Sequence, residues 1–170
     1  MKIIEAMKKI KHLQEKAADL QAKVKQHCAD LDYETPVYPD QRAQIAEWIQ
    51  SHTDTVQEIA RLRVAIQRTN LATEVSIQLG DRTATKTIAE WIHRRKDLAK
   101  LDLAMWGSLG DRGLREGMIA TSTGGQKEVR IRRYFNPKER DEKMALYRQE
   151  PMLIDSTLEV VNATTELIEK

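Results

Sequence analysis

Arginine residues crowd one stretch of this chain, at spacings that could hold an anion. Residues 82–140 contain 14 Lys and Arg against 7 Asp and Glu, although the whole chain of 170 residues has a formal net charge of only +2. The guanidinium group of arginine binds phosphate and carboxylate through a planar fork of N–H donors. The charge distribution therefore predicts an anion-binding region within this stretch.

The candidate ligand-binding residues come from a predicted helix, a glycine-rich loop and a predicted strand. The strand residues occupy alternate positions, so we expect their side chains to share one face. Arginine forks and an aromatic ring are what a phosphorylated, base-containing ligand requires, through charge-assisted hydrogen bonds to phosphate and stacking on the base. We predict that the binding residues are Arg94, Arg95, Arg112, Arg115, Arg130, Arg132 and Tyr134.

A solvated basic surface is the alternative to a binding site. In that interpretation the arginines pair with acidic neighbours. Residues 141–170 supply an excess of these, with 7 Asp and Glu against 3 Lys and Arg. The sequence leaves both interpretations open.

No catalytic or metal-binding pattern accompanies the arginines. The glycine-rich run 107–113 lacks the Gly-Lys-Ser/Thr of a phosphate-binding loop, and no Gly-x-Ser-x-Gly occurs. The histidines are scattered over three predicted helices, without the convergence that zinc needs; they are His12, His27, His52 and His93. We predict a non-enzymatic protein with no catalytic residue, metal ligand or cofactor.

The composition is that of a folded chain that does not enter a membrane. Hydrophobic residues make up 41% and charged residues 32%, and no apolar run reaches the length of a transmembrane helix. The chain becomes charged at Lys2, unlike a signal peptide, and its single Cys28 favours a reducing compartment. We therefore expect no membrane partner and a cytoplasmic location, which is the host cytoplasm if the protein is viral.

Heptad-like spacing predicts long helices at the start of the chain. Apolar residues recur every three or four positions from Ile3 to Leu31, as in the seam of a coiled coil. Two prolines within residues 32–39 end this helix. Asp40 is an N-cap residue type, and a second helix runs from it to about Asn70. The two helices are expected to form a long antiparallel hairpin.

Alternating residues and glycine turns predict a small β element after that hairpin. Residues 73–79 alternate as a strand does, and a helix begins after Thr87 and runs to about Leu109. The pair Gly124-Gly125 then separates residues 118–123 from residues 126–135, as in a β-hairpin.

A last helix from about Lys138 repeats the heptad spacing, and Pro151 should kink or split it. The predicted fold class is mainly α: a long antiparallel helical hairpin or bundle, with a minor α+β part made of a strand and a β-hairpin. We predict a single domain over residues 1–170, composed of a helical hairpin (1–70), a basic α/β insert (71–137) and a C-terminal helix (138–170).

Several short motifs, taken in chain order, resemble the septicolysin-like family of small helical proteins from bacteria and their phages. They are Met1–Ala6, Ile66–Asn70, Gly80–Thr83 leading into Ile88-Ala89, Arg94–Leu98, Asp141, and Ile154-Asp155 before Asn162. The sequence departs from the family pattern after the first helix, where residues 33–39 replace an expected glutamate-rich loop. It implies a helical architecture and does not imply membrane insertion.

These observations predict a homo-oligomeric binding protein that captures a phosphorylated or nucleotide-like ligand, such as a phage-type protein that sequesters a nucleotide signal. A structural or assembly protein, for instance a virion or scaffold component acting through coiled-coil contacts, is the first alternative. The second is a single-stranded nucleic-acid binder acting through residues 130–135. The nearly neutral chain argues against the large phosphate footprint that nucleic acid would need.

Overall fold

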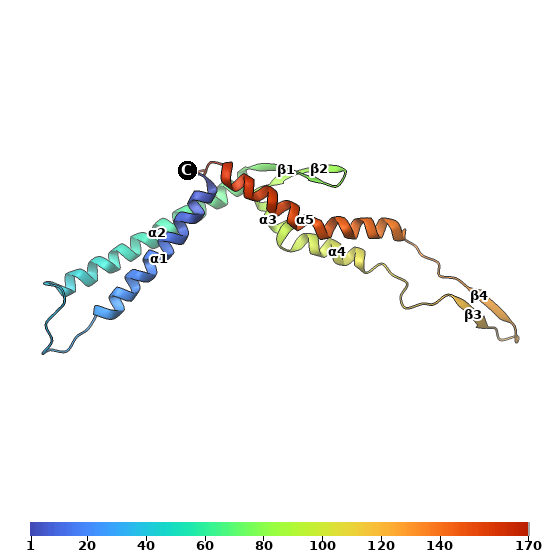
Figure 1. Cartoon of the computed structure of the whole chain (residues 1–170), viewed down its shortest axis with the longest axis horizontal. Coiled ribbons are helices and arrows are strands. Elements are labelled where there is room, and N and C mark those ends of the chain that lie inside the picture. The colour runs from blue at the N-terminus through green and yellow to red at the C-terminus, as the bar shows by residue number, and fades with distance from the viewer. Residues whose placement is uncertain (170) are drawn as a thin grey trace. The chain divides into compact units, whose positions relative to one another are not determined.

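The computed structural model describes residues 1–169, and these are mainly helical with two small β-hairpins, which confirms the predicted fold class (Figure 1). The elements in chain order are α1 (Ile3–His27), α2 (Gln41–Ala72), β1 (Glu74–Leu79), β2 (Arg82–Thr87), α3 (Ile88–His93), the π-helical turn η1 (Arg94–Leu98), α4 (Ala99–Gly107), β3 (Gly117–Ala120), β4 (Gln126–Val129) and α5 (Pro137–Thr164).

The chain divides into two compact units. Unit 1 contains Met1–Glu74, Thr87–Ala89 and the described residues from Leu158 onward, and unit 2 contains Val75–Lys86 and Glu90–Thr157. The three parts predicted from the sequence do not map one to one onto these units, because α5 contributes residues to both.

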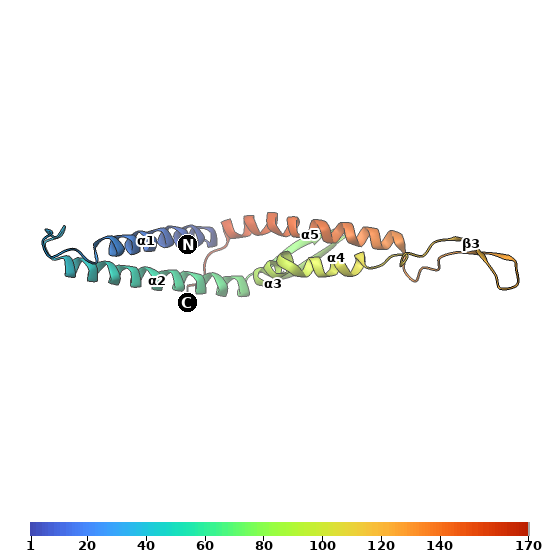
Figure 2. The ribbon, with the colours of Figure 1, turned by 90° about the horizontal axis from the view of Figure 1, so that it is seen from below.

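Unit 1 is built on the predicted antiparallel hairpin. Helices α1 and α2 run side by side (Figures 1 and 2), and the seam of α1 packs on α2 of the same chain. Leu20, Trp48 and Leu62 are among the buried side chains of this contact. Helix α1 ends earlier than predicted, at His27, whose carbonyl accepts a hydrogen bond of 2.8 Å from the side chain of Gln41.

The two ends of the described chain pair with each other within unit 1. The Ile3 amide donates to the Thr165 carbonyl at 3.1 Å, and the Leu167 amide donates to the Met1 carbonyl at 2.7 Å. The Ile168 amide donates to the hydroxyl of buried Thr69 at 2.8 Å. No local pattern predicts this pairing, because it joins residues far apart in the sequence.

An ion-pair cluster joins α1 to α2 at Glu58. One oxygen of the Glu58 carboxylate lies 2.8 Å from Lys9 Nζ, and the other lies 2.8 Å from Arg61 Nε. Hydrogen bonds from Arg61, and then from Lys9, lower the pKa of Glu58 to about 2. Because the folded-state pKa is depressed, these contacts stabilise the fold above the ordinary pKa of 4.5, and their contribution is lost as pH falls toward 2.

We expect Glu58→Gln to lower the free energy of unfolding by about 1 kcal/mol at neutral pH, a value discounted for the partial exposure of the cluster. The loss should shrink as the wild-type carboxylate becomes protonated in acid. Urea denaturation of both proteins at about pH 7 and about pH 3 measures the difference. Glu15→Gln, on the exposed surface of α1, is the control. An equal loss at both pH values would contradict the ion-pair explanation.

Unit 2 packs most of the β1–β2 hairpin, α3 from Glu90 onward, η1 and α4 with the part of α5 that precedes Leu158. Its core includes Ile77, Leu79 and Ile154, together with Trp91, which is completely buried. The indole Nε1 of Trp91 donates a hydrogen bond of 2.9 Å to the Val75 carbonyl, which joins the helix to strand β1.

Strand β2 was not predicted from the sequence. A single strand was predicted over residues 73–79, whereas β1 turns at Gly80-Asp81 and pairs with β2. Gly80 has a φ of +61°, a conformation that favours glycine. Residues 82–87 are mostly threonine and basic residues, so they lack the apolar alternation that identifies a half-buried strand.

The second hairpin is confirmed, but its strands are shorter than predicted. Strands β3 and β4 are antiparallel, with Gly117 opposite Val129 and Ala120 opposite Gln126. Strand β4 ends at Val129, so Arg130, Arg132 and Tyr134 do not share a strand face as predicted. Few contacts beyond the hairpin stabilise a longer ladder, because most of both strands is exposed.

Helix α5 continues through Pro151, so the predicted split does not occur. Proline removes one backbone hydrogen bond and costs about 3 kcal/mol inside a helix. Glu150 and Ile154, on either side of it, are buried. Tertiary packing of these side chains offsets the local cost.

Candidate ligand-binding site

The structure divides the seven predicted binding residues between two regions of unit 2. Arg94 and Arg95 begin η1, whereas the other five lie in the segment between α4 and α5. Residues 109–136 of that segment, including the β3–β4 hairpin, are here called the arm. The predicted residues therefore do not form one continuous site.

Arg94 is held in place by acidic side chains and is not free for a ligand. Its Nε and Nη2 atoms lie 2.5 and 2.9 Å from the two carboxylate oxygens of Glu150, which is 2% exposed. Nη1 donates to Asp102, and the guanidinium carbon lies 5.4 Å from the centre of the Tyr147 ring. The hydrogen bonds that Arg94 donates to Glu150, followed by the one that it donates to Asp102, raise the pKa of Arg94, so this cation stays charged.

This ion-pair network forms part of the wall of a cleft of about 470 Å³. The lining comes from strands β1 and β2, helices α3, α4 and α5, and the π-helical turn. A π-helical turn inside an α-helix often marks a functional position, because it changes the direction of the side chains around it. The lining residues are Leu79, Arg82, Ala84, Lys86, Glu90, Trp91, His93, Arg94, Leu98, Asp102, Tyr147 and Glu150.

The cleft combines aromatic surface with charges of both signs. Arg82 and Lys86 reach it from β2, and both residues are exposed. Together with Ala84 they occupy alternate positions of the strand, so their side chains share one face. The other face carries Thr85, whose hydroxyl lies 2.7 Å from that of Ser76 on β1. Arg82 and Lys86 were not among the predicted binding residues, because residues 82–87 were not predicted to form a strand.

Arg95, the second residue of η1, is not part of the cleft lining. Its Nη1 atom lies 2.5 Å from Oδ1 of Asp155 on α5, and both side chains are partly exposed. Such a pair between an arginine and an acidic neighbour is what a solvated basic surface, the alternative to a binding site, predicts. Arg95 therefore supports the packing of η1 against α5 within unit 2.

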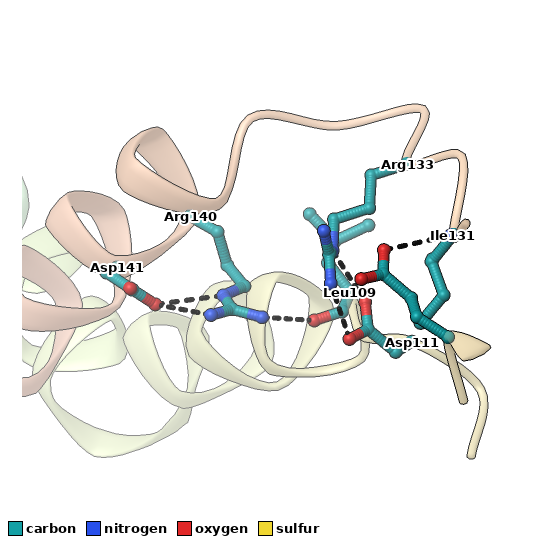
Figure 3. A network of polar contacts seen from close by, with 7 residues as sticks. Leu109, Asp111, Ile131, Arg133, Arg140 and Asp141 are labelled. Carbon is teal, nitrogen blue, oxygen red and sulfur yellow. Dashed lines mark hydrogen bonds and ion pairs between the residues drawn. The ribbon is translucent and has the colours of Figure 1, made fainter. Parts of the chain in front are cut away.

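The base of the arm is tied by a second polar network (Figure 3). Arg133 donates two hydrogen bonds of 2.7 Å to the carboxylate of Asp111, and Glu116 accepts one of 3.0 Å from the Ile131 amide. Arg140 donates to the Leu109 carbonyl at 3.1 Å and is paired with the neighbouring Asp141. Arg133 was not in the predicted set, and here it serves as a tether.

The remaining predicted residues project from the arm into solvent. Arg130 lies 3.3 Å from Glu128, and Tyr134 is 89% exposed. Within residues 1–169, no side chain supplies a hydrogen bond or ion pair to Arg112, Arg115 or Arg132. The arm thus presents unpaired guanidinium groups and one exposed aromatic ring.

Replacing Asp111 with asparagine should loosen the arm without unfolding the helices. The Arg133 guanidinium lowers the pKa of Asp111, so the carboxylate remains ionised at neutral pH and the tether is lost only when acid protonates it. Hydrogen exchange followed by mass spectrometry should show faster exchange over residues 109–136 in Asp111→Asn, with unchanged exchange in α2. Glu128→Gln, which removes only the longer contacts to Arg130, is the control. Equal exchange in all three proteins would contradict the tether.

Two other features that would indicate a function are a metal site and a membrane-spanning helix. Residues 1–169 contain no group of three or more His, Cys, Asp or Glu side chains placed to hold a metal ion. None of the helices within the same residues combines the length and apolar character needed to cross a membrane.

Comparison with known proteins identifies a related architecture. No protein-family model matches this chain, and no curated protein does. A crystal structure of a functionally unknown conserved protein from Corynebacterium diphtheriae is similar over 99% of this chain and 99% of its own, with a TM-score of 0.56 and 19% sequence identity. The two chains share a fold. The resemblance to the septicolysin-like family stays a prediction.

Proposed function

We propose that this protein is a non-enzymatic binding protein that captures a phosphorylated or nucleotide-like small ligand in the cleft of unit 2. The observation that carries the proposal is the meeting of Arg82, Lys86 and the Tyr147 ring around about 470 Å³. Clefts that hold small organic ligands have volumes of about 300–1,000 Å³. The proposed ligand-binding cations, Arg82 and Lys86, are thus not among the residues predicted from the sequence.

Each part of the cleft suits a different part of such a ligand. Arg82 and Lys86 are exposed and can donate charge-assisted hydrogen bonds to phosphate oxygens. The ring of Tyr147 offers a surface on which a base can stack. The Asp102 carboxylate can accept hydrogen bonds from hydroxyl or amino groups. Arg94 acts indirectly, because its bonds to Glu150 and Asp102 hold the wall of the cleft in place.

Sequestration of the ligand is the role that fits these residues best. The cleft brings a held arginine and free cations together, and the proposal assigns none of them to a chemical step. A protein of this kind lowers the free concentration of its ligand by binding it, as a phage-type sequestering protein does. A homo-oligomer in the cytoplasm remains part of this proposal.

Isothermal titration with ATP, 5′-AMP and inorganic phosphate tests the cleft. We expect at least one nucleotide to bind, and Arg82→Ala with Lys86→Ala to weaken that binding by about tenfold or more. Lys100→Ala, an exposed cation of α4 outside the cleft lining, and Arg130→Ala with Arg132→Ala on the arm are matched controls and should leave it unchanged. Loss of binding in the arm variant with normal binding in the cleft variant would refute the assignment to the cleft.

Binding of single-stranded nucleic acid by the arm is a second candidate function. It is favoured by the exposure of Tyr134 and by the unpaired guanidinium groups of Arg112, Arg115 and Arg132 among the described residues. Aromatic rings stack on bases, while nearby cations contact the backbone. Fluorescence anisotropy with a labelled RNA oligomer should then show affinity that falls steeply with salt and is lost in the arm variant.

A further inference from the structure

Helix α2 carries a second stripe, mostly of apolar residues, that α1 does not cover. Seven positions form it: Ile49, Thr53, Val56, Ala60, Val64, Gln67 and Leu71. All seven residues are exposed, and Leu71 is 67% exposed. The buried residues Trp48, Ile59 and Leu62 lie on the face of α2 that packs within unit 1. At about 100° per residue, the stripe falls within a narrow band on the opposite side of the helix.

The residue types of the stripe are arranged almost symmetrically about Ala60. Val56 and Val64 lie four residues to either side of it, the polar Thr53 and Gln67 lie seven to either side, and Ile49 and Leu71 lie eleven to either side. A two-fold axis that relates antiparallel helices places each residue opposite its mirror position in the sequence. Such an axis at Ala60 sets Val56 against Val64, Thr53 against Gln67 and Ile49 against Leu71.

We propose that two copies of this chain associate through α2, antiparallel, with the two-fold axis at Ala60. The small Ala60 side chain lets the two helices approach closely at the axis, and the branched side chains fill the seam on both sides. The stripe is formed by residues of α2 alone and shares no residue with the cleft. The dimer and the ligand-binding proposal can therefore fail independently.

One pair of opposite charges beside the stripe suits this arrangement. Asp54 and Arg68 flank the stripe on the same side of α2, six residues before and eight residues after Ala60. In the antiparallel register they lie at nearly the same height, about 3 Å apart along the helix axis. Asp54 is thereby brought to the height of the partner's Arg68, and the two-fold axis repeats the pair. Arg61, which lies between them around the helix, comes to the height of its own copy, but it is already paired with Glu58.

A groove at one end of the stripe fits the residue that the register brings to it. Leu20, Gln21 and Val24 of α1, with Ile49 and His52 of α2, line a groove of about 250 Å³. The proposed dimer places the partner's Leu71 opposite Ile49, at this groove. Leu71 is the most exposed apolar side chain of the stripe. Its burial at the partner's groove would remove this apolar surface from water, which stabilises the dimer.

Sedimentation velocity measures the association. We expect the wild-type protein to sediment as a dimer, and Val56→Glu with Val64→Glu to weaken dimerisation by about tenfold or more, with normal helicity by circular dichroism. Met105→Glu is the matched control, because Met105 is 70% exposed but lies on α4. A monomeric wild type, or a dimer that the double variant leaves intact, would overturn the proposal.

Cross-linking tests the register in a Cys28→Ala background. A short bifunctional thiol reagent should join two copies of Ala60→Cys at the axis and should not join copies of Ile49→Cys, which the register separates by about 33 Å. Asp54→Arg and Arg68→Asp should each weaken the dimer, and the double exchange should restore it. Cross-linking of Ile49→Cys but not of Ala60→Cys, or no recovery in the double exchange, would overturn the antiparallel arrangement.

Discussion

Trp91→Ala is expected to lower the free energy of unfolding by about 4 kcal/mol, the largest effect of any single substitution proposed for this protein. The indole is completely buried, so its removal leaves a cavity between the helix and the β1–β2 hairpin. It also leaves the Val75 carbonyl without the hydrogen bond from Nε1. Because small domains are stable by only about 5–15 kcal/mol, the variant should be close to unfolding at ambient temperature.

Urea denaturation followed by far-ultraviolet circular dichroism measures this effect, since the substitution alters tryptophan fluorescence. Trp91→Phe keeps most of the apolar volume and should cost about 1–2 kcal/mol, mainly the lost hydrogen bond. Trp106→Ala on α4 is the matched control, because Trp106 is only partly buried. Similar losses for Trp91→Ala and Trp106→Ala would contradict the central position of Trp91 in unit 2.

Glu150→Ala is expected to cost about 3 kcal/mol, because it removes the buried partner of a guanidinium group that is itself mostly buried. Arg94 would keep its hydrogen bond to Asp102 and its contact with the Tyr147 ring. Asp155→Ala breaks the exposed pair with Arg95 about one helical turn farther along α5, and it should cost less than about 1 kcal/mol.

A double-mutant cycle of Arg94→Ala and Glu150→Ala separates the pair from the rest of the fold. If the two side chains stabilise each other, the double variant should be less destabilised than the sum of the single variants, by about 2 kcal/mol. Equal effects of Glu150→Ala and Asp155→Ala would show that burial does not distinguish these two ion pairs.

Helix positions and the class of fold could be predicted from the sequence because both depend on local patterns. The seam of α1, the prolines of the connecting loop and the glycine pair between β3 and β4 each determine a local structure. Helix α5 shows the limit of this reasoning. Pro151 is a strong local signal, but the burial of Glu150 and Ile154 outweighs it, and burial depends on the tertiary structure.

The candidate site was less predictable, because the sequence shows charge but not which carboxylates lie near it. Arg94 was correctly placed on a helix, yet its partner Glu150 is 56 residues away in the sequence. Arg82 and Lys86 belong to a strand without an apolar alternation, so no sequence pattern indicated that their side chains reach the same cleft. Their alternate positions, with Ala84 between them, were the signal that could have identified them.

Native mass spectrometry of the protein purified from cells tests the central claim most directly, because it detects a retained ligand whatever the identity of that ligand. We predict an additional mass of a few hundred daltons per cleft, the size that such a volume admits. This mass should be lost in the Arg82→Ala, Lys86→Ala variant and kept in the Arg130→Ala, Arg132→Ala variant. A wild-type protein that carries no ligand after incubation with a small-molecule extract, or a ligand retained by the cleft variant, would contradict the proposed function.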